Sequence, residues 1–186
     1  MESHLRLGRQ HVKWLYQAAL EAANPATAVA HNLQRSGADL IIGQKQRYRW
    51  KTGRVFLVSV GKAAAPMAEA AERILGEALH AGVVISKTGP VAPHRGTSRL
   101  AFYRGNHPVS GAESLAATTA VRHLLKDTTA ADLVLCLISG GTSALLTQPL
   151  ISLEDWQALN QTLLASGCPI DAFNLVRRQL DAVKGG

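Results

Sequence analysis

Short apolar runs alternate with longer amphipathic stretches along most of the chain. The run RVFLVSV at 54–60 is almost wholly apolar and rich in β-branched residues, a pattern that predicts a strand buried on both faces. Shorter runs of the same kind predict strands at 83–86, 100–103 and 133–138. Because helical stretches separate these runs, we predict an α/β fold in which a mostly parallel sheet is flanked by helices on both faces.

Helical spacing and helix end signals mark the stretches around these runs. Two helices are predicted over 11–33, with a break at Asn24-Pro25, and we expect both to cover the core. An alanine-rich helix is predicted over 63–79, with Pro66 in its first turn. The other predicted helices span 112–126, 143–146, 153–165 and 170–183, and a loop rich in Gly, Pro and His is expected over 88–98.

Size and composition fit one globular domain. The chain has 186 residues, of which 47% are hydrophobic and 18% charged, so it can bury a sizeable core. No run approaches the ~20 apolar residues of a membrane-spanning helix, and the first ten residues lack the apolar segment of a secretory signal. We therefore expect a cytoplasmic protein. Cys136 and Cys168 lie in or beside apolar stretches without metal-ligand spacing, which predicts buried cysteines and no structural metal.

The chain has a positive net charge, and part of the excess of basic residues is concentrated in one segment. Lys and Arg number 20 against 13 Asp and Glu, for a formal net charge of +7, and this excess favours anionic partners. In the segment KQRYRWK at 45–51, basic residues alternate with Tyr48 and Trp50, so a strand would place charges and aromatic rings on opposite faces. We predict an edge strand whose aromatic side chains pack inward. A surface for single-stranded nucleic acid is the alternative, which we disfavour.

Two strand-to-helix connections carry small and polar residues: Ser59-Val60-Gly61-Lys62-Ala63 and Ser139-Gly140-Gly141-Thr142-Ser143. In parallel sheets such connections gather at the carboxyl ends of the strands, where ligands bind. Glycines let backbone amides approach an anion closely, and hydroxyl groups add donors. Neither connection matches a standard nucleotide motif. A tight strand-to-helix turn with N-cap hydroxyls explains the second connection equally well.

Lys62 adds a charge to the first connection. It follows a buried strand at the expected start of a helix, where the helix dipole disfavours a cation by about 0.3–1 kcal/mol. A lysine in this place indicates a bound anion, and a side chain that extends into solvent is the alternative. Lys62 is therefore the leading functional residue.

Four segments occur in a fixed order: VSVGKAAAPMAEAAE, GNHPV, LISGGTSALL and NLVRRQLDAVKGG. Together they resemble the N-terminal domain of the glycerate 2-kinase family, often labelled hydroxypyruvate reductase. The resemblance covers most of the chain. It implies a Rossmann-like domain and the transfer of the ATP γ-phosphoryl group to D-glycerate, giving 2-phosphoglycerate, with Mg²⁺ bound through the substrate phosphates.

The resemblance also implies roles for individual residues. Lys62 lies on a lysine implicated in catalysis. The residues that the resemblance places near substrate or phosphate are Gly61, Ser139, Gly140, Gly141, Thr142, Ser143, His107, Asn174, Arg177 and Lys184. A role in stabilising its own loop is the alternative for His107, and Arg178 is expected to face solvent. No residue is assigned to a metal.

The sequence departs from the pattern of the family in three places. Thr142 stands where a third glycine is usual, and because a β-branched residue disfavours positive φ we expect this loop to approach phosphate less freely. Asp181 replaces a serine and would bring a negative charge close to the anion site. Ser110-Gly111 replaces Pro-Asp.

The family has a second, smaller domain that would supply further catalytic residues across the cleft, and the chain stops before it. We therefore expect a partial domain with little or no turnover alone. A non-catalytic domain that binds a nucleotide or a phosphorylated metabolite is the alternative. A hydroxypyruvate reductase is a minor alternative, because no G-x-G-x-x-G with a later acidic residue is present. A serine hydrolase is disfavoured because GGTSA is not G-x-S-x-G. A homo-oligomer is left open, and no membrane or nucleic-acid partner is expected.

Overall fold

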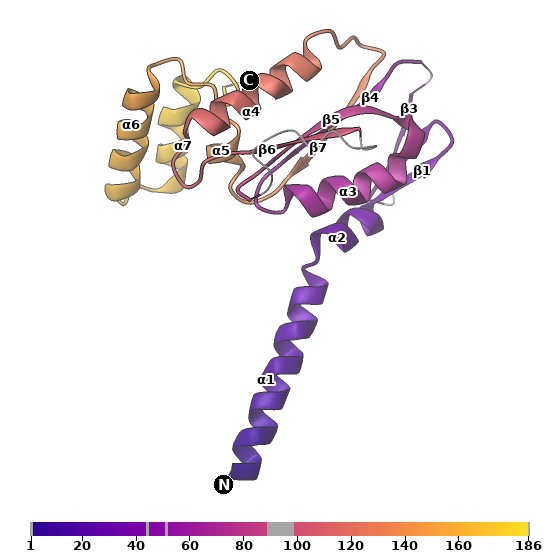
Figure 1. Cartoon of the computed structure of the whole chain (residues 1–186), viewed down its shortest axis with the longest axis vertical. Helices are drawn as coiled ribbons and strands as arrows, with labels where there is room; N and C mark the ends of the chain where they lie inside the picture. The colour runs from indigo at the N-terminus through magenta and orange to yellow at the C-terminus, as the bar shows by residue number, and fades with distance from the viewer. Residues whose placement is uncertain (1, 44, 51, 89–98, 186) are drawn as a thin grey trace.

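A four-stranded parallel sheet forms the centre of the computed structural model, which describes residues 2–43, 45–50, 52–88 and 99–185, with side chains from residue 6 onward. The strand order is β6-β5-β4-β7. The strands are β4 (Val55–Val60), β5 (Leu79–Ser86), β6 (Leu100–Arg104) and β7 (Leu133–Ile138). Helices α3 (Ala64–Leu75) and α4 (Ala112–Leu125) cover opposite faces of the sheet (Figure 1). The predicted α/β fold with a mostly parallel sheet is confirmed.

Side chains that alternate along the strands divide the core into two clusters. In β4, Leu57 belongs to the cluster beneath α3, whereas Val58 and Val60 belong to the cluster beneath α4. All residues of β4 are buried, as its unbroken apolar run predicted, because β5 and β7 pair with it on either side.

A second, antiparallel sheet in the order β1-β2-β3 precedes the parallel one. Its strands are β1 (Leu33–Ser36), β2 (Asp39–Ile42) and β3 (Gln46–Arg49), and the first two were not predicted because they are short and of mixed polarity. β3 is the predicted edge strand. Its Tyr48 side chain is 46% exposed, so the expected inward packing of this ring is wrong, while Trp50 just beyond the strand packs against the core. Arg47 and Arg49 both form ion pairs with Asp39 of β2.

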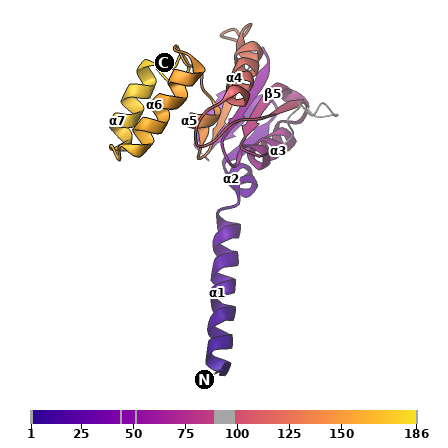
Figure 2. The same cartoon turned by 60° about the vertical axis from the view of Figure 1, so that its left-hand side comes forward.

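The predicted break between the first two helices is confirmed. Asn24 caps α2 (Pro25–Asn32) by accepting hydrogen bonds from the N–H groups of Ala26 and Thr27. α2 covers the core through Val29, but α1 (Glu2–Ala22) projects away from the sheet (Figures 1 and 2). The expectation that α1 also covers the core is therefore wrong, and its Leu15 is 71% exposed. None of the described helices is long and apolar enough to span a membrane.

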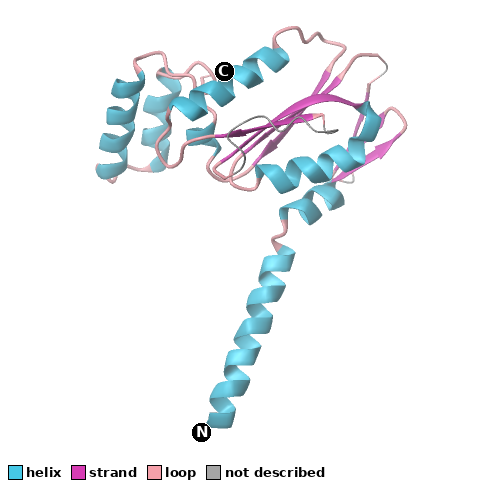
Figure 3. Ribbon diagram, viewed as in Figure 1, coloured by secondary structure: helices cyan, strands magenta, loops and turns pink. Residues whose placement is uncertain are grey.

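Three short helices follow the parallel sheet: α5 (Thr142–Leu145), α6 (Leu153–Ala165) and α7 (Ile170–Gln179). α6 and α7 lie side by side next to α5 (Figures 2 and 3). α7 ends earlier than predicted because the chain then turns back, and the N–H of Leu150 donates to the carbonyl of Leu180 at 2.9 Å. The helix predicted over 63–79 likewise ends at Leu75, because the 3-10 turn η1 (Gly76–Ala78) leads directly into β5.

The expected burial of Cys136 is wrong. Cys136 is exposed and Cys168 is partly exposed. β7 is one of the two edge strands of the parallel sheet, and beside Cys136 a hollow of about 800 Å³ lies open between Val58, Val121 and Leu146. The α4 face of the sheet is thus incompletely covered at this edge. Except for Thr88, the loop expected over 88–98 lies outside the described residues.

An ion pair fixes β4 against β7 at the ends where both strands begin. The Asp132 side chain, 3% exposed, accepts hydrogen bonds from the main-chain N–H of Arg54 at 2.7 Å and from its guanidinium at 2.9 Å. The N–H of Thr129 adds a third bond at 2.8 Å. These donors hold the pKa of Asp132 far below its usual range. The pair therefore helps to fix the register of β4 against β7. This register sets the relative position of the two connections that follow the strands at their other ends.

We expect Asp132→Asn to lower the free energy of unfolding near pH 7. Because the folded state lowers the pKa of Asp132, its carboxylate stabilises the fold above the ordinary carboxyl pKa, and this contribution is lost as the pH falls below it. The difference from the wild type should therefore begin to shrink below about pH 4 and keep shrinking as the pH falls further. Denaturant unfolding at several pH values measures this, with exposed Asp171→Asn as the control. Equal stability of D132N and wild type near pH 7 would contradict the assignment.

Candidate functional site

The strand order creates a switch point between β4 and β7. After β4 the chain passes to α3 on one face of the sheet, and after β7 it passes to α5, whose Leu145 packs in the cluster on the other face. In doubly wound sheets a crevice opens where neighbouring strands send their connections to opposite faces, and ligands bind there. The two glycine connections expected to bind an anion are the two that flank this point.

Backbone contacts join the two connections directly. The N–H of Lys62 donates to the carbonyl of Gly140 at 2.8 Å, and the N–H of Ala63 donates to Oγ of Ser139 at 3.1 Å. Gly61 has φ 132°, and a Cβ at this position would lie 2.1 Å from Oγ and 2.6 Å from the carbonyl oxygen of Ser139. Glycine at 61 is therefore required by the approach of the second connection. The Ser139 hydroxyl is engaged between the connections.

The two glycines of the second connection have different surroundings. Gly141 has φ 95°, and a Cβ there would lie 3.1 Å from Cδ2 of His107 and 3.4 Å from Cγ of Lys62. Gly140 faces open space, with no atom within 4 Å of a Cβ placed on it. The structure thus brings Lys62, His107 and Gly141 together around an open loop. Lys62 is exposed and forms no salt bridge within the described ranges.

The strain expected at Thr142 does not occur there. The left-handed conformation falls on Gly141, and Thr142 is the first residue of α5. Its hydroxyl lies 2.7 Å from the carbonyl oxygen of Ser139 and 2.9 Å from that of Val60. Thr142 therefore ties the end of β4 to the second connection and restricts the loop through hydrogen bonding instead of backbone strain.

His107 contributes a neutral imidazole to the same region. Burial lowers the pKa of His107, and the charges of Lys62 and Lys87 lower it further. A neutral ring can both donate and accept a hydrogen bond. The loop that carries His107 is anchored to α4, because the N–H of Asn106 donates to Oγ of Ser114 at 2.8 Å.

Two of the predicted anion ligands are engaged inside the protein, where Arg177 is buried and Lys184 is partly buried. The Arg177 guanidinium donates through Nη2 to the carbonyl of Ser143 at 2.6 Å and lies near the rings of Trp156 and Phe173. The Lys184 ammonium donates to the carbonyl of Leu146 at 2.8 Å. Both cations therefore bind carbonyl groups in and just after α5, the helix that follows the glycine loop.

Asp181 does not bring a free negative charge to the site. Its buried carboxylate pairs with Lys184 at 2.5 Å and accepts a hydrogen bond from the hydroxyl of Thr147. The expected repulsion of an anion is thus offset locally. Asn174 lies with Ser143, Lys184 and the exposed Arg178 around a hollow of about 480 Å³, which none of the glycines of the two connections lines.

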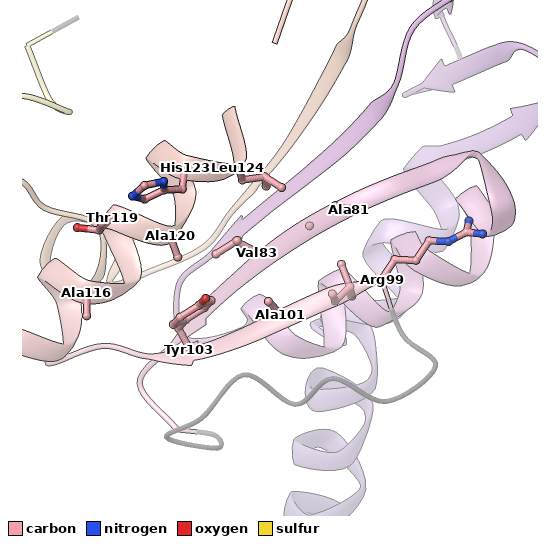
Figure 4. A pocket seen from close by; sticks show the side chains of 12 residues that line it. Ala81, Val83, Arg99, Ala101, Tyr103, Ala116, Thr119, Ala120, His123 and Leu124 are labelled. Atoms are coloured by element: carbon pink, nitrogen blue, oxygen red, sulfur yellow. The ribbon is translucent and has the colours of Figure 1, made fainter. Parts of the chain in front are cut away.

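Two further hollows contain residues that were not predicted. One, of about 340 Å³, adjoins the glycine loop and includes Asn160 and Phe173 of α6 and α7. No motif marks these residues, because Phe173 resembles an ordinary core position and Asn160 is a single polar residue within a helix. The other, of about 660 Å³, lies between β5, β6 and α4 and includes Tyr103 and His123 (Figure 4). It contains none of the predicted site residues.

The chain is similar in sequence and structure to known proteins. A model of the family described as a domain of unknown function, DUF4147, matches residues 11–186. A putative hydroxypyruvate reductase from Agrobacterium vitis is 35% identical over 180 residues, covering 96% of this chain and 37% of that protein. The D-glycerate 2-kinase of Thermotoga maritima is 36% identical over 178 residues, covering 92% of this chain and 38% of that protein.

A solved structure shares the fold. The crystal structure of the PH0495 protein from Pyrococcus horikoshii OT3 matches with a TM-score of 0.81 and 34% identity, covering 96% of this chain and 40% of that one. The chain therefore spans 37% and 38% of the length of the two curated relatives and 40% of the solved structure.

We expect Gly61→Ala to lower the free energy of unfolding by about 1–3 kcal/mol or more, because a methyl group would clash with Ser139 at a strained φ. Gly140→Ala, with open space around its Cβ, should change it by less than about 0.5 kcal/mol. Denaturant unfolding of the two variants is the measurement. If both lose the same stability, the close approach of the two connections is not what requires glycine at position 61.

Proposed function

The chain belongs to the DUF4147 family, the N-terminal domain of glycerate kinases, and from this premise we propose that it carries the phosphate-binding site of an ATP-dependent glycerate 2-kinase. The observation that carries the proposal is the position of Lys62, an exposed ammonium with no salt bridge in the described ranges, beside the open Gly140-Gly141 loop at the switch point. A site of this kind suits a phosphate group.

The residues fit a nucleotide phosphate. A side chain at Gly140 would extend into unoccupied space, so this side of the loop is free to receive a ligand. Lys62 supplies a compact positive charge, and the Ser143 hydroxyl stands within α5 just after the loop. Thr142 and Ser139 are engaged in hydrogen bonds between the connections, so we assign them to shaping the loop.

In the proposed reaction the 2-hydroxyl oxygen of D-glycerate attacks the γ-phosphorus of ATP, the bond to the β-phosphate oxygen breaks, and the hydroxyl proton is released. Lys62 would hold the transferring phosphoryl group and stabilise the charge that spreads over its oxygens. The neutral His107 ring, next to Gly141, would accept or donate a hydrogen bond to the ligand without adding a second full charge.

Mg²⁺ would reach this site with the nucleotide. Among the described residues no group of three or more His, Cys, Asp or Glu side chains could hold a metal ion. The ion would therefore be bound mainly by phosphate oxygens, where it neutralises charge. Lys62, whose side chain lies beside Gly141, would share the same oxygens.

A non-catalytic domain that binds a nucleotide or a phosphorylated metabolite is the second candidate. One observation favours it: two of the predicted anion ligands, Arg177 and Lys184, donate to carbonyl groups in and just after α5. Phosphoryl transfer requires several groups held in position together, whereas binding of a phosphate group requires fewer. A hydroxypyruvate reductase, the name given to one relative, is less well supported, because the connection after β4 has no G-x-G-x-x-G for a dinucleotide.

We expect a chimaera to be an active glycerate kinase when this chain replaces the matching part of the Thermotoga maritima enzyme. Its product, 2-phosphoglycerate, would be followed in a coupled assay with D-glycerate, ATP and Mg²⁺. Lys62→Ala in the chimaera should lower kcat by about two orders of magnitude or more, because a charge on the transferring phosphoryl group is lost. Lys126→Ala, an exposed lysine at the end of α4, is the matched control.

The outcomes separate the two candidates. A folded chimaera that binds ATP but forms no 2-phosphoglycerate would favour the binding domain. Near-normal turnover of the Lys62→Ala chimaera would remove Lys62 from the mechanism.

A further inference from the structure

An apolar hollow of about 340 Å³ adjoins the proposed phosphate site. His107, Gly141 and Ser143 line one side of it, and residues of α6, α7 and the turn between them line the other. Because it shares Gly141 and His107 with the phosphate site, a ligand whose phosphates lie on the glycine loop could place its remaining part in this hollow.

The far walls of the hollow are mainly apolar. Leu164 at the end of α6 is 54% exposed, Ile170 at the start of α7 is 66% exposed, and Phe173, which also lines the hollow, is 7% exposed. Exposed aliphatic side chains around a concave surface are typical of ligand pockets, which use apolar walls for affinity and a few polar groups for orientation.

Two buried polar groups provide such orientation. Arg177 lines the hollow and is 6% exposed, and its Nε–H has no hydrogen-bond partner among the described residues, although Nη2 is bound to Ser143. Asn160, also on the wall, donates through Nδ2 to the carbonyl of Trp156 at 2.6 Å. Its amide oxygen accepts no hydrogen bond within the described ranges, so each of these two lining residues carries one polar atom without a partner there.

We propose that this hollow binds the adenine ring of ATP, an inference that rests on the proposed kinase function. An adenine edge presents an amino donor beside a ring-nitrogen acceptor, which matches the Asn160 oxygen and the Arg177 Nε–H. Its flat faces suit the walls formed by Leu164 and Phe173. A glycerate molecule has an oxygen on every carbon and would leave these apolar walls unused.

The test compares ligands by isothermal titration calorimetry on the 186-residue chain. The ligands are MgATP, MgGTP, inorganic triphosphate and D-glycerate. The hollow variant is Leu164→Gln/Ile170→Gln, and the matched control is Leu150→Gln/Leu175→Gln, two leucines that are 64% and 61% exposed and lie outside the hollow. All four positions are exposed, so each variant should fold, and thermal unfolding checks this.

We expect ATP to bind at least about tenfold more tightly than triphosphate or GTP, and the hollow variant to lose that advantage while its triphosphate affinity is unchanged. The control variant should match the wild type. The adenine site is overturned if ATP and triphosphate bind equally, if GTP binds as tightly as ATP, or if the hollow variant weakens only D-glycerate binding. If neither ATP nor triphosphate binds to the chain, the proposed phosphate site is wrong, and the adenine site is wrong with it.

Discussion

The close contact between the connections after β4 and β7 is the constraint on which the rest of the site depends. Gly61 lies against Ser139 so closely that any side chain would collide, and Lys62 donates its N–H to Gly140. Parallel pairing of β4 with β7 brings these connections to one edge, and the Arg54–Asp132 pair helps to fix that pairing from the other end. The position of the Lys62 side chain beside Gly141 follows from this contact.

Helix α5 links the loop to the C-terminal part of the chain. Its first residue follows Gly141. The carbonyl of Ser143 within α5 accepts a hydrogen bond from Arg177, and the carbonyl of Leu146 just after α5 accepts one from Lys184. In this structure the two cations predicted to bind an anion donate to backbone carbonyl groups, and Lys184 also pairs with Asp181. A cation that is buried or partly buried is costly to leave without a partner, so these contacts link α7 and the end of the chain to the position of α5.

Much of the fold could be predicted because each strand of the parallel sheet contains a run of apolar residues. β4 is the clearest example, and the connection that follows it contacts the connection after β7. The strand order could not be predicted, since periodicity carries no information about which strands pair. The projection of α1 and the exposure of Cys136 were missed because an apolar pattern indicates what a segment can bury and leaves its partner unspecified. The engagement of Arg177 and Lys184 was missed for a similar reason, because a charge pattern does not show whether a carbonyl group lies within reach.

The most direct test of the central claim is a two-dimensional ¹H–¹⁵N NMR titration of the labelled chain with MgATP. If the switch point binds phosphate, the amide signals of Gly61, Lys62, Gly140 and Gly141 should shift together and saturate with one dissociation constant. Shifts confined to the hollow between α4 and β6, or to the basic strand β3, would contradict the account, because they would place the anion away from the contact between the two connections.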